Sequence, residues 1–224
     1  MKFGIVVFPG SNCDRDMELA LQQMNKDVVM LWHKDSDLSS FSTNDCIVLP
    51  GGFSYGDYLR CGAIARFSPM MQSVIDFANK GGKVLGICNG FQILCESGLL
   101  PGVLLQNANQ QFICKNVWLK SDGALNDKNA GPLQIPIAHG EGRYYANEVL
   151  LDTIEKNNLV LFRYCNGTGH IHKSYCPNGA ERGIAGIRNL HGNVYGMMPH
   201  PERAANITLG NVDGIKVFDL LGIN

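Results

Sequence analysis

The first ninety residues alternate between short apolar runs and amphipathic segments. The continuous apolar runs have the length and composition of strands buried on both faces, and they fall at residues 3–8, 28–32, 46–49 and 83–87. The segments between them carry apolar side chains at helical spacing, and they fall at residues 14–24, 68–79 and 89–97. This alternation is typical of strands joined by crossover helices, and it predicts a parallel sheet covered on both faces.

The second half has a different pattern. Five strand-like runs are separated by turn residues, at residues 112–119, 133–138, 159–164, 184–188 and 193–198, and a last helix is predicted within residues 212–221. No repeat or flexible linker separates the two halves. We therefore predict one α/β domain over residues 1–224, a flavodoxin-like open parallel sheet with helices on both faces and an antiparallel β extension in the C-terminal half. In such sheets the ligand site lies beyond the carboxyl ends of the strands.

Composition and charge narrow the classes of partner. The 224 residues are 45% hydrophobic, and 19 Lys and Arg face 20 Asp and Glu, so the net charge of -1 favours neither nucleic acid nor an anionic membrane surface. The apolar start of the chain is too short for a signal peptide, and no run approaches the ~18 residues of a membrane span. The eight cysteines lack zinc-ribbon and thioredoxin spacings. We expect free thiols in a cytoplasmic protein.

One of these cysteines lies at a predicted junction of strand and helix. Cys88 is flanked two residues on either side by Gly86 and Gly90, where a sharp turn would raise a nucleophile above the sheet. The N–H groups at the start of the following helix would favour its thiolate, and the Asn89 amide is a candidate donor to an oxyanion. The alternative from this segment alone is an ordinary buried cysteine.

A second segment supplies the base that a thiolate nucleophile needs. His200 precedes Pro201, which favours an extended backbone, and in extended backbone residues 200 and 202 point the same way. Glu202 could then accept the imidazole N–H and orient the base. Gly51, Gly52 and Phe53 follow the third predicted strand, and their backbone amides could complete an oxyanion hole. Taken singly, residues 200–202 could be a rigid surface loop, and residues 51–53 could be a tight turn.

These motifs together resemble the triad-type, or class I, glutamine amidotransferases. The resemblance is carried by residues 86–92 (Gly-Ile-Cys-Asn-Gly-Phe-Gln), by the Gly51-Gly52 loop and by residues 200–202 (His-Pro-Glu). Longer segments resemble the family of glutaminase subunits of phosphoribosylformylglycinamidine synthase, and they lie at residues 8–14, 51–60, 138–142 and 196–203. One segment departs from that family: residues 176–180 read Cys-Pro-Asn-Gly-Ala instead of the usual Asn-Pro-Asn-Gly-Ser.

The resemblance implies a reaction in two stages. Cys88 would attack the side-chain amide of glutamine and form a glutamyl thioester, with His200 donating a proton to the departing ammonia. Water activated by His200 would then release glutamate. Gln92, His139 and Gly140 are implied to hold glutamine.

The resemblance also implies partners. Ammonia would pass to a large synthetase subunit, in a complex with a small accessory subunit, for a step of purine synthesis. That subunit would use ATP and Mg²⁺ to convert phosphoribosylformylglycinamide to phosphoribosylformylglycinamidine. The chain itself is expected to hold no cofactor, because the glutaminase domain accounts for all 224 residues.

Two alternative functions stay open at this point. One is a stand-alone cysteine hydrolase of the DJ-1/PfpI type, which shares the strand–nucleophile–helix turn. Gln92 and the His200-Pro201-Glu202 segment argue against it. The other is a catalytically silent, flavodoxin-like interaction module, which the presence of Cys88, His200 and Glu202 argues against.

Other polar groups receive weaker predictions. Four residues of types that ligate zinc lie close together in the sequence: Cys165, His170, His172 and Cys176. Their spacing is not a common zinc-finger pattern, so we expect an exposed loop without a metal. Residues 10–12 (Gly-Ser-Asn) are predicted to form a turn and a helix cap, because they lack the phosphate-binding patterns.

Several charged residues and cysteines lie near these motifs in the sequence. The charged side chains that follow Gly52 are Asp57, Arg60 and Arg66. They could form a solvated face, although the resemblance favours a surface shared with the synthetase. Three cysteines have no base beside them in sequence and are predicted to be core or incidental residues: Cys13, Cys61 and Cys95.

Overall fold

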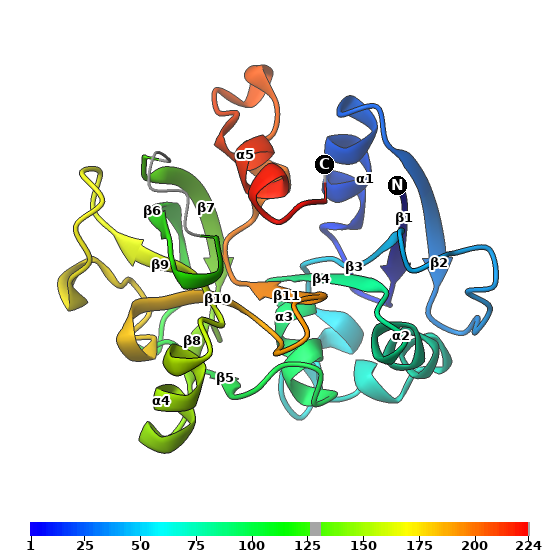
Figure 1. Ribbon diagram of the computed structural model, residues 1–224, viewed down its shortest axis with the longest axis horizontal. Helices are drawn as coiled ribbons and strands as arrows, with labels where there is room; N and C mark the ends of the chain where they lie inside the picture. The colour runs from blue at the N-terminus through cyan, green and yellow to red at the C-terminus, as the bar shows by residue number, and fades with distance from the viewer. Residues whose placement is uncertain (126–130, 224) are drawn as a thin grey trace.

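The centre of the molecule is a nine-stranded sheet. The computed structural model describes residues 1–125 and 131–223, and Figure 1 shows the sheet running across it. The strand order is β2-β1-β3-β4-β11-β10-β9-β6-β7. In that order the strands are Asp27–Trp32, Lys2–Val7, Cys46–Leu49, Lys83–Ile87, Val194–Met197, Ile184–Arg188, Val160–Cys165, Ile113–Ser121 and Leu133–His139.

Five strands form the parallel half of the sheet. Neighbouring strands in the series β2-β1-β3-β4-β11 all pair in parallel, which is the flavodoxin-like order. Figure 1 shows α1 (Asp14–Gln23) and α5 (Asp213–Leu220) on one side of this half of the sheet, and α2 (Pro69–Asn79) and α3 (Asn89–Glu96) on the other. The predicted fold class is confirmed.

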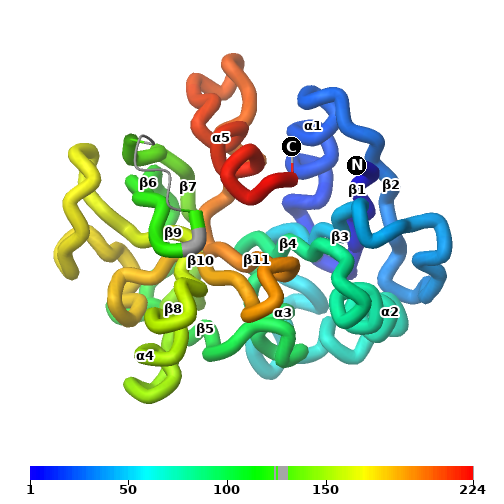
Figure 2. The backbone as a smooth tube through the Cα atoms, viewed as in Figure 1, coloured from blue at the N-terminus to red at the C-terminus, as the bar shows by residue number. Residues whose placement is uncertain are grey.

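The other four strands form the antiparallel extension. β10, β9, β6 and β7 each pair antiparallel with the preceding strand of the sheet, and they occupy the left half of the backbone trace in Figure 2. β11 follows them in sequence, yet it returns to the middle of the sheet and pairs in parallel with β4. All four of its residues are buried, as expected of a strand covered on both faces.

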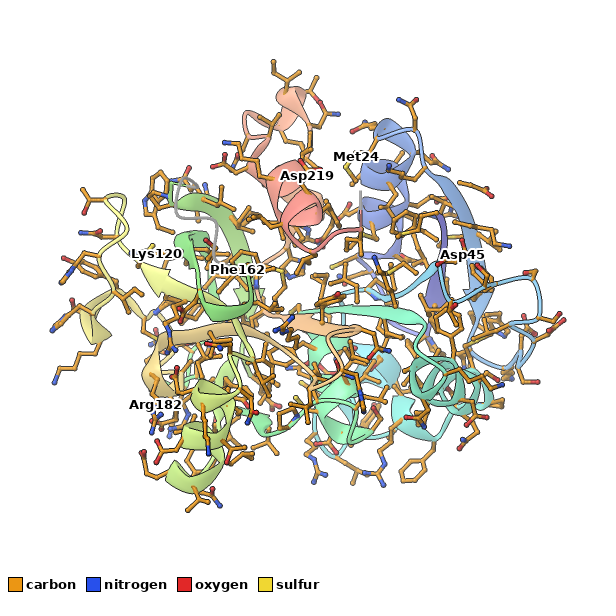
Figure 3. The ribbon with its side chains drawn as sticks, viewed as in Figure 1. Met24, Asp45, Lys120, Phe162, Arg182 and Asp219 are labelled. Atoms are coloured by element: carbon orange, nitrogen blue, oxygen red, sulfur yellow. The ribbon has the colours of Figure 1, made fainter. Side chains whose placement is uncertain are left out.

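Three elements were not predicted from the sequence. The strands β5 (Val103–Leu105) and β8 (Arg143–Tyr145) form a separate two-stranded sheet, and each is too short to show an alternating pattern. The helix α4 (Glu148–Lys156) had a visible start signal, because the Asn147 side chain accepts a hydrogen bond from the Leu150 amide at 2.9 Å. The Arg182 guanidinium, labelled in Figure 3, pairs with two carboxylates of α4.

One cluster of buried side chains runs through both halves of the sheet. Ile5 and Leu85 contribute to it from the parallel strands, and Leu119 and Phe162 from the extension. The two halves therefore share a core. In the part of the chain that the structure describes, no helix combines the length and hydropathy that a membrane span needs.

At Gly90 the backbone of α3 approaches that of β3 very closely. A Cβ placed on Gly90 would lie 1.9 Å from the carbonyl oxygen of Leu49. Gly90→Ala should therefore lower the free energy of unfolding in urea by roughly 3 kcal/mol, because helix and strand must separate. Gly131→Ala is the matched control, since a Cβ there meets no atom of the described residues within 4 Å. Equal stability of the two variants would contradict this packing.

Candidate active site

Several loops meet beyond the carboxyl ends of β1, β3, β4, β7 and β11. They enclose a cavity of about 120 Å³. Its lining consists of Asn12, Cys13, Gly52, Phe53, Cys88, Phe112, Ala138, His200 and Arg203. This is the position at which an open parallel sheet places its ligand site.

Cys88 occupies the turn between β4 and α3, as predicted. Its φ of 51° and ψ of -105° are unfavourable for a residue with a side chain. The turn is held because the Cys88 amide donates to the Met197 carbonyl at 2.8 Å and the Gln92 amide donates to the Cys88 carbonyl at 3.1 Å. The thiol is 5% exposed and donates to the Ala138 carbonyl at 3.7 Å. It thus lies in the cavity between β4 and the end of β7.

His200 and Glu202 form a buried pair after β11. The His200 amide donates to the Pro136 carbonyl at 2.8 Å, and Nδ1 of His200 lies 2.6 Å from Oε1 of Glu202. The pairing agrees with the sequence prediction, but the predicted backbone was partly wrong. His200 itself is near-extended, with φ -101° and ψ 88°, whereas Pro201–Ala204 form a short 3₁₀ turn that brings Glu202 back to the imidazole.

The pKa values of two neighbouring imidazoles, His200 and His139, are shifted in opposite directions. Burial lowers the pKa of His200, but the Glu202 carboxylate and the Cys88 sulfur outweigh burial and raise that pKa well above 6.5. Burial, with a smaller contribution from His200, lowers the pKa of His139 to about 4. Near neutral pH the site therefore favours a charged His200 beside a neutral His139, which suits proton donation by His200.

The loop after β3 packs against the loop after β1. The Phe53 amide donates to the Gly10 carbonyl at 2.9 Å, so it is engaged in holding the loops together, and the Phe53 ring lines the cavity. A Cβ on Gly52 would lie 2.7 Å from the Asn12 nitrogen, which leaves room there for glycine alone. Asn89 opens α3, where backbone N–H groups have no partner within the helix. The Gly52 and Asn89 backbone amides therefore stay candidates for oxyanion donors.

A chain of side-chain amides connects α3 to the loop after β7. Nδ2 of Asn89 donates to Oε1 of Gln92 at 2.9 Å, and Oδ1 of Asn89 accepts from the Ser54 amide at 3.2 Å. Nε2 of Gln92 donates to the Glu141 carbonyl at 2.6 Å. Asp57 joins this chain, since its carboxylate accepts from Nδ2 of Asn89 at 3.3 Å. Gln92 and Asn89 are thus buried residues that fix two walls of the site.

Two asparagines, which the sequence did not single out as site residues, hold the His139-Gly140 segment. Oδ1 of Asn107 lies 3.0 Å from Nδ1 of His139 and accepts from the Gly142 amide at 3.1 Å. Nδ2 of Asn178 donates to the Gly142 carbonyl at 2.7 Å. Asn178 lies in the segment that departs from the family pattern at positions 176 and 180, and it is the residue of that segment that reaches the site. No periodicity or spacing marks Asn107.

Cys13 is buried, as one of its two predicted placements allowed, but it is more than an incidental residue. It lines the same cavity as Cys88, and Nη2 of Arg203 donates to its sulfur at 3.2 Å. The predicted turn lies slightly earlier, at residues 8–11, where the Ser11 amide donates to the Phe8 carbonyl at 3.0 Å. The predicted helix cap was wrong, because Cys13 occupies the N-cap of α1 and its side chain makes no capping hydrogen bond. Oγ of Ser11 accepts instead from the Phe8 amide at 3.3 Å.

The four residues considered for zinc do not share one exposed loop. His170 and His172 are exposed, but the prediction was wrong for Cys165, which ends β9 and is 3% exposed. The rings of His170 and His172 stack with centroids 6.4 Å apart, and the Cys176 thiol donates to Asn178 at 3.4 Å. Over residues 1–125 and 131–223, the one set of ligand-type atoms lying within 4.8 Å of one another belongs to Cys13, His200 and Glu202. There the His200–Glu202 hydrogen bond and the Arg203 cation favour proton transfer over cation binding.

The charged residues after Gly52 fold back onto α3. Arg60 makes a two-bond contact with the Glu96 carboxylate at 2.6 and 2.7 Å, and Nη1 of Arg66 donates to the Glu96 carbonyl at 2.8 Å. The Cys95 thiol donates to the Pro101 carbonyl at 3.9 Å. Burial, followed by Asp57 and Glu141, raises the pKa of the Cys61 thiol.

The strained backbone at Cys88 has a measurable consequence. Glycine adopts φ 51° and ψ -105° without the clash that any Cβ causes. Cys88→Gly should therefore be more stable than Cys88→Ala by about 1 kcal/mol in urea unfolding, although glycine normally costs stability. A Cys88→Gly variant that is the less stable of the two would show that the turn is not strained.

The chain matches proteins of one family along most of its length. The model of the CobB/CobQ-like glutamine amidotransferase domain matches residues 1–214. Phosphoribosylformylglycinamidine synthase subunit PurQ of Moorella thermoacetica is 54% identical, over 97% of this chain and 94% of the relative. The same subunit of Salinibacter ruber is 49% identical, over 98% and 95%.

A solved structure extends the match to the fold. The structure of PurLQS from Thermotoga maritima contains a chain with a TM-score of 0.82 and 40% sequence identity, covering 98% of this chain and 96% of that one. The resemblance inferred from the motifs is thereby confirmed. The chain belongs to the glutamine amidotransferases and, within them, to the family of phosphoribosylformylglycinamidine synthase subunits named PurQ.

Proposed function

We propose that this chain is the glutaminase subunit of phosphoribosylformylglycinamidine synthase, with Cys88, His200 and Glu202 as its catalytic triad. The observation that carries the proposal is the buried His200–Glu202 hydrogen bond of 2.6 Å beside a cysteine on a strained turn. A nucleophile, a base and a group that orients the base are the elements of covalent amide hydrolysis. Membership of the family supplies the substrate class.

In the first step the Cys88 sulfur attacks the side-chain amide carbon of glutamine. The C=O oxygen becomes an oxyanion, which the amides of Gly52 and Asn89 stabilise. His200 donates the proton that the departing nitrogen needs, and the raised pKa of His200 favours the charged form that can do so. Ammonia leaves, and a glutamyl thioester remains on Cys88.

In the second step water hydrolyses the thioester. His200, now neutral, accepts a proton from the water as it attacks the thioester carbon, and the same two amides stabilise the second oxyanion. The carbon–sulfur bond breaks, and the thiol and glutamate are released. Glu202 keeps Nδ1 of His200 protonated through both steps, so that Nε2 is the nitrogen that exchanges the proton.

We assign Gln92, His139 and Gly140 to the glutamine pocket, beside the cavity that the Phe53 ring lines. Nε2 of Gln92 donates to the Glu141 carbonyl, and Asn107, which contacts Nδ1 of His139, accepts from the Gly142 amide, so these bonds hold the Gly140–Gly142 backbone in place. With its pKa lowered to about 4, His139 stays neutral and adds no second cation beside His200.

We further propose that the chain works in a complex, as one domain over residues 1–224. Ammonia passes to a large synthetase subunit, which uses ATP and Mg²⁺, and a small accessory subunit completes the assembly. The solved relative from Thermotoga maritima, PurLQS, supports such an assembly. The eight free cysteines support a cytoplasmic location.

The two alternative functions are less well supported. A stand-alone hydrolase of the DJ-1/PfpI type would not need Gln92 to join α3 to the loop after β7, as it does here. A silent interaction module would have no reason to bury the His200–Glu202 pair beside Cys88.

The central test separates glutamine chemistry from synthesis. In the assembled complex, Cys88→Ala should reduce glutamine-dependent formation of phosphoribosylformylglycinamidine by roughly 1,000-fold or more, because the nucleophile is lost. Synthesis with ammonium chloride should be unchanged, because ammonia then reaches the partner directly. Both rates are measured on the same preparation.

Cys95→Ala is the control, because Cys95 lies on the same helix but outside the cavity. It should leave both rates near those of the wild type. Loss of both activities in Cys88→Ala would mean that Cys88 supports assembly rather than glutamine hydrolysis. Retention of both would exclude Cys88 as the nucleophile.

A further inference from the structure

A second thiol lies in the catalytic cavity. Cys13 comes from the loop after β1 and is 3% exposed, and it lines the cavity together with Cys88 and His200. Its sulfur lies within 4.8 Å of both a ring nitrogen of His200 and a carboxylate oxygen of Glu202. The two-step reaction above uses no such group, so its role has to come from what it contacts.

The sulfur of Cys13 is held by a charged donor. Nη2 of Arg203 donates to it at 3.2 Å, and Nε of Arg203 donates to the carboxylate of Asp16 at 2.9 Å. Asp16 lies in the first turn of α1, and the Cys13 amide is fixed to the Gly51 carbonyl at 3.3 Å. Hydrogen bonds from a charged donor are stronger and more directional than neutral ones. Cys13 is therefore anchored through both its backbone and its side chain.

The anchored sulfur lies against the imidazole. A Cβ placed on Gly51 would meet Cε1 of His200 at 2.7 Å and the Cys13 sulfur at 3.1 Å, so ring and thiol fill the same small space. The other ring nitrogen is not fixed in this way. Within the described residues, Nε2 of His200 has no hydrogen-bond partner. Glu202 fixes the position of Nδ1, and the orientation of the rest of the buried ring depends on the groups packed against it.

We propose that Cys13 is a positioning residue for His200: its sulfur, held by Arg203 and Asp16, supports the imidazole so that Nε2 stays directed at Cys88. This role rests on the proposed triad. Cys13 takes no part in bond making. Arg203 directly follows Glu202 in the Pro201–Ala204 turn. The segment that carries His200 therefore also carries the guanidinium that holds the Cys13 sulfur.

The side chain of Cys13 can be changed in two informative ways. In the assembled complex, Cys13→Ala should lower kcat for glutamine hydrolysis about tenfold with little change in KM, because a tilted base slows the chemistry but leaves the glutamine walls intact. Cys13→Ser should restore kcat to within about threefold of the wild type, since its oxygen can accept from Arg203. Asp16→Asn should lower kcat in the same direction, because it loosens Arg203. Steady-state kinetics at varied glutamine give each value.

The controls separate this inference from the proposed function. Cys95→Ala should leave kcat unchanged, and ammonia-dependent synthesis should report an intact complex for every variant. If the wild type hydrolyses glutamine and Cys88→Ala does not, the triad stands, and the Cys13 variants test the inference alone. Wild-type kcat in Cys13→Ala, no recovery in Cys13→Ser, or a change confined to KM would overturn it. Unchanged kcat in Asp16→Asn would overturn the part given to Arg203.

Discussion

The tight crossing of α3 over β3 is the constraint on which the site depends. Cys88 holds a strained conformation only because β11 and the first turn of α3 fix the residues on both sides of it. Gly90 lets the helix approach the Leu49 carbonyl, and Oδ1 of the neighbouring Asn89 accepts from the Ser54 amide, which ties the start of α3 to the loop that carries Gly52. The nucleophile and the proposed oxyanion donors are thus positioned by one packing contact.

Buried charge is the second element of the account. The His200–Glu202 pair lies out of contact with water, where an ion pair costs free energy unless its geometry is well satisfied. The site meets this cost with a 2.6 Å hydrogen bond and keeps the neighbouring His139 neutral. Arg203 adds a cation that is itself paired with Asp16. His200, Glu202, Arg203 and Asp16 are therefore each paired with a group of opposite charge.

The sequence predicted those parts of the molecule that local patterns encode. Continuous apolar runs identified the parallel strands, and the spacing of Gly86, Cys88 and Gly90 identified the turn. The helix α4 was missed although Asn147 caps it. The strand β11 was predicted, but its four residues do not reveal that it is buried in the middle of the sheet. The contact of Cys13 with the cavity and with Arg203 was missed, because Arg203 is 190 residues away in the chain. Asn107 likewise acts through contacts that only folding creates.

The most direct measurement is to identify the residue that carries the covalent intermediate. The assembled complex is quenched in acid during turnover of isotopically labelled glutamine, digested, and examined by peptide mass spectrometry. The account predicts one labelled glutamyl group per chain, on the peptide that contains Cys88, and none on the peptide that contains Cys13. Label on Cys13, or ammonia release with no labelled peptide, would contradict it.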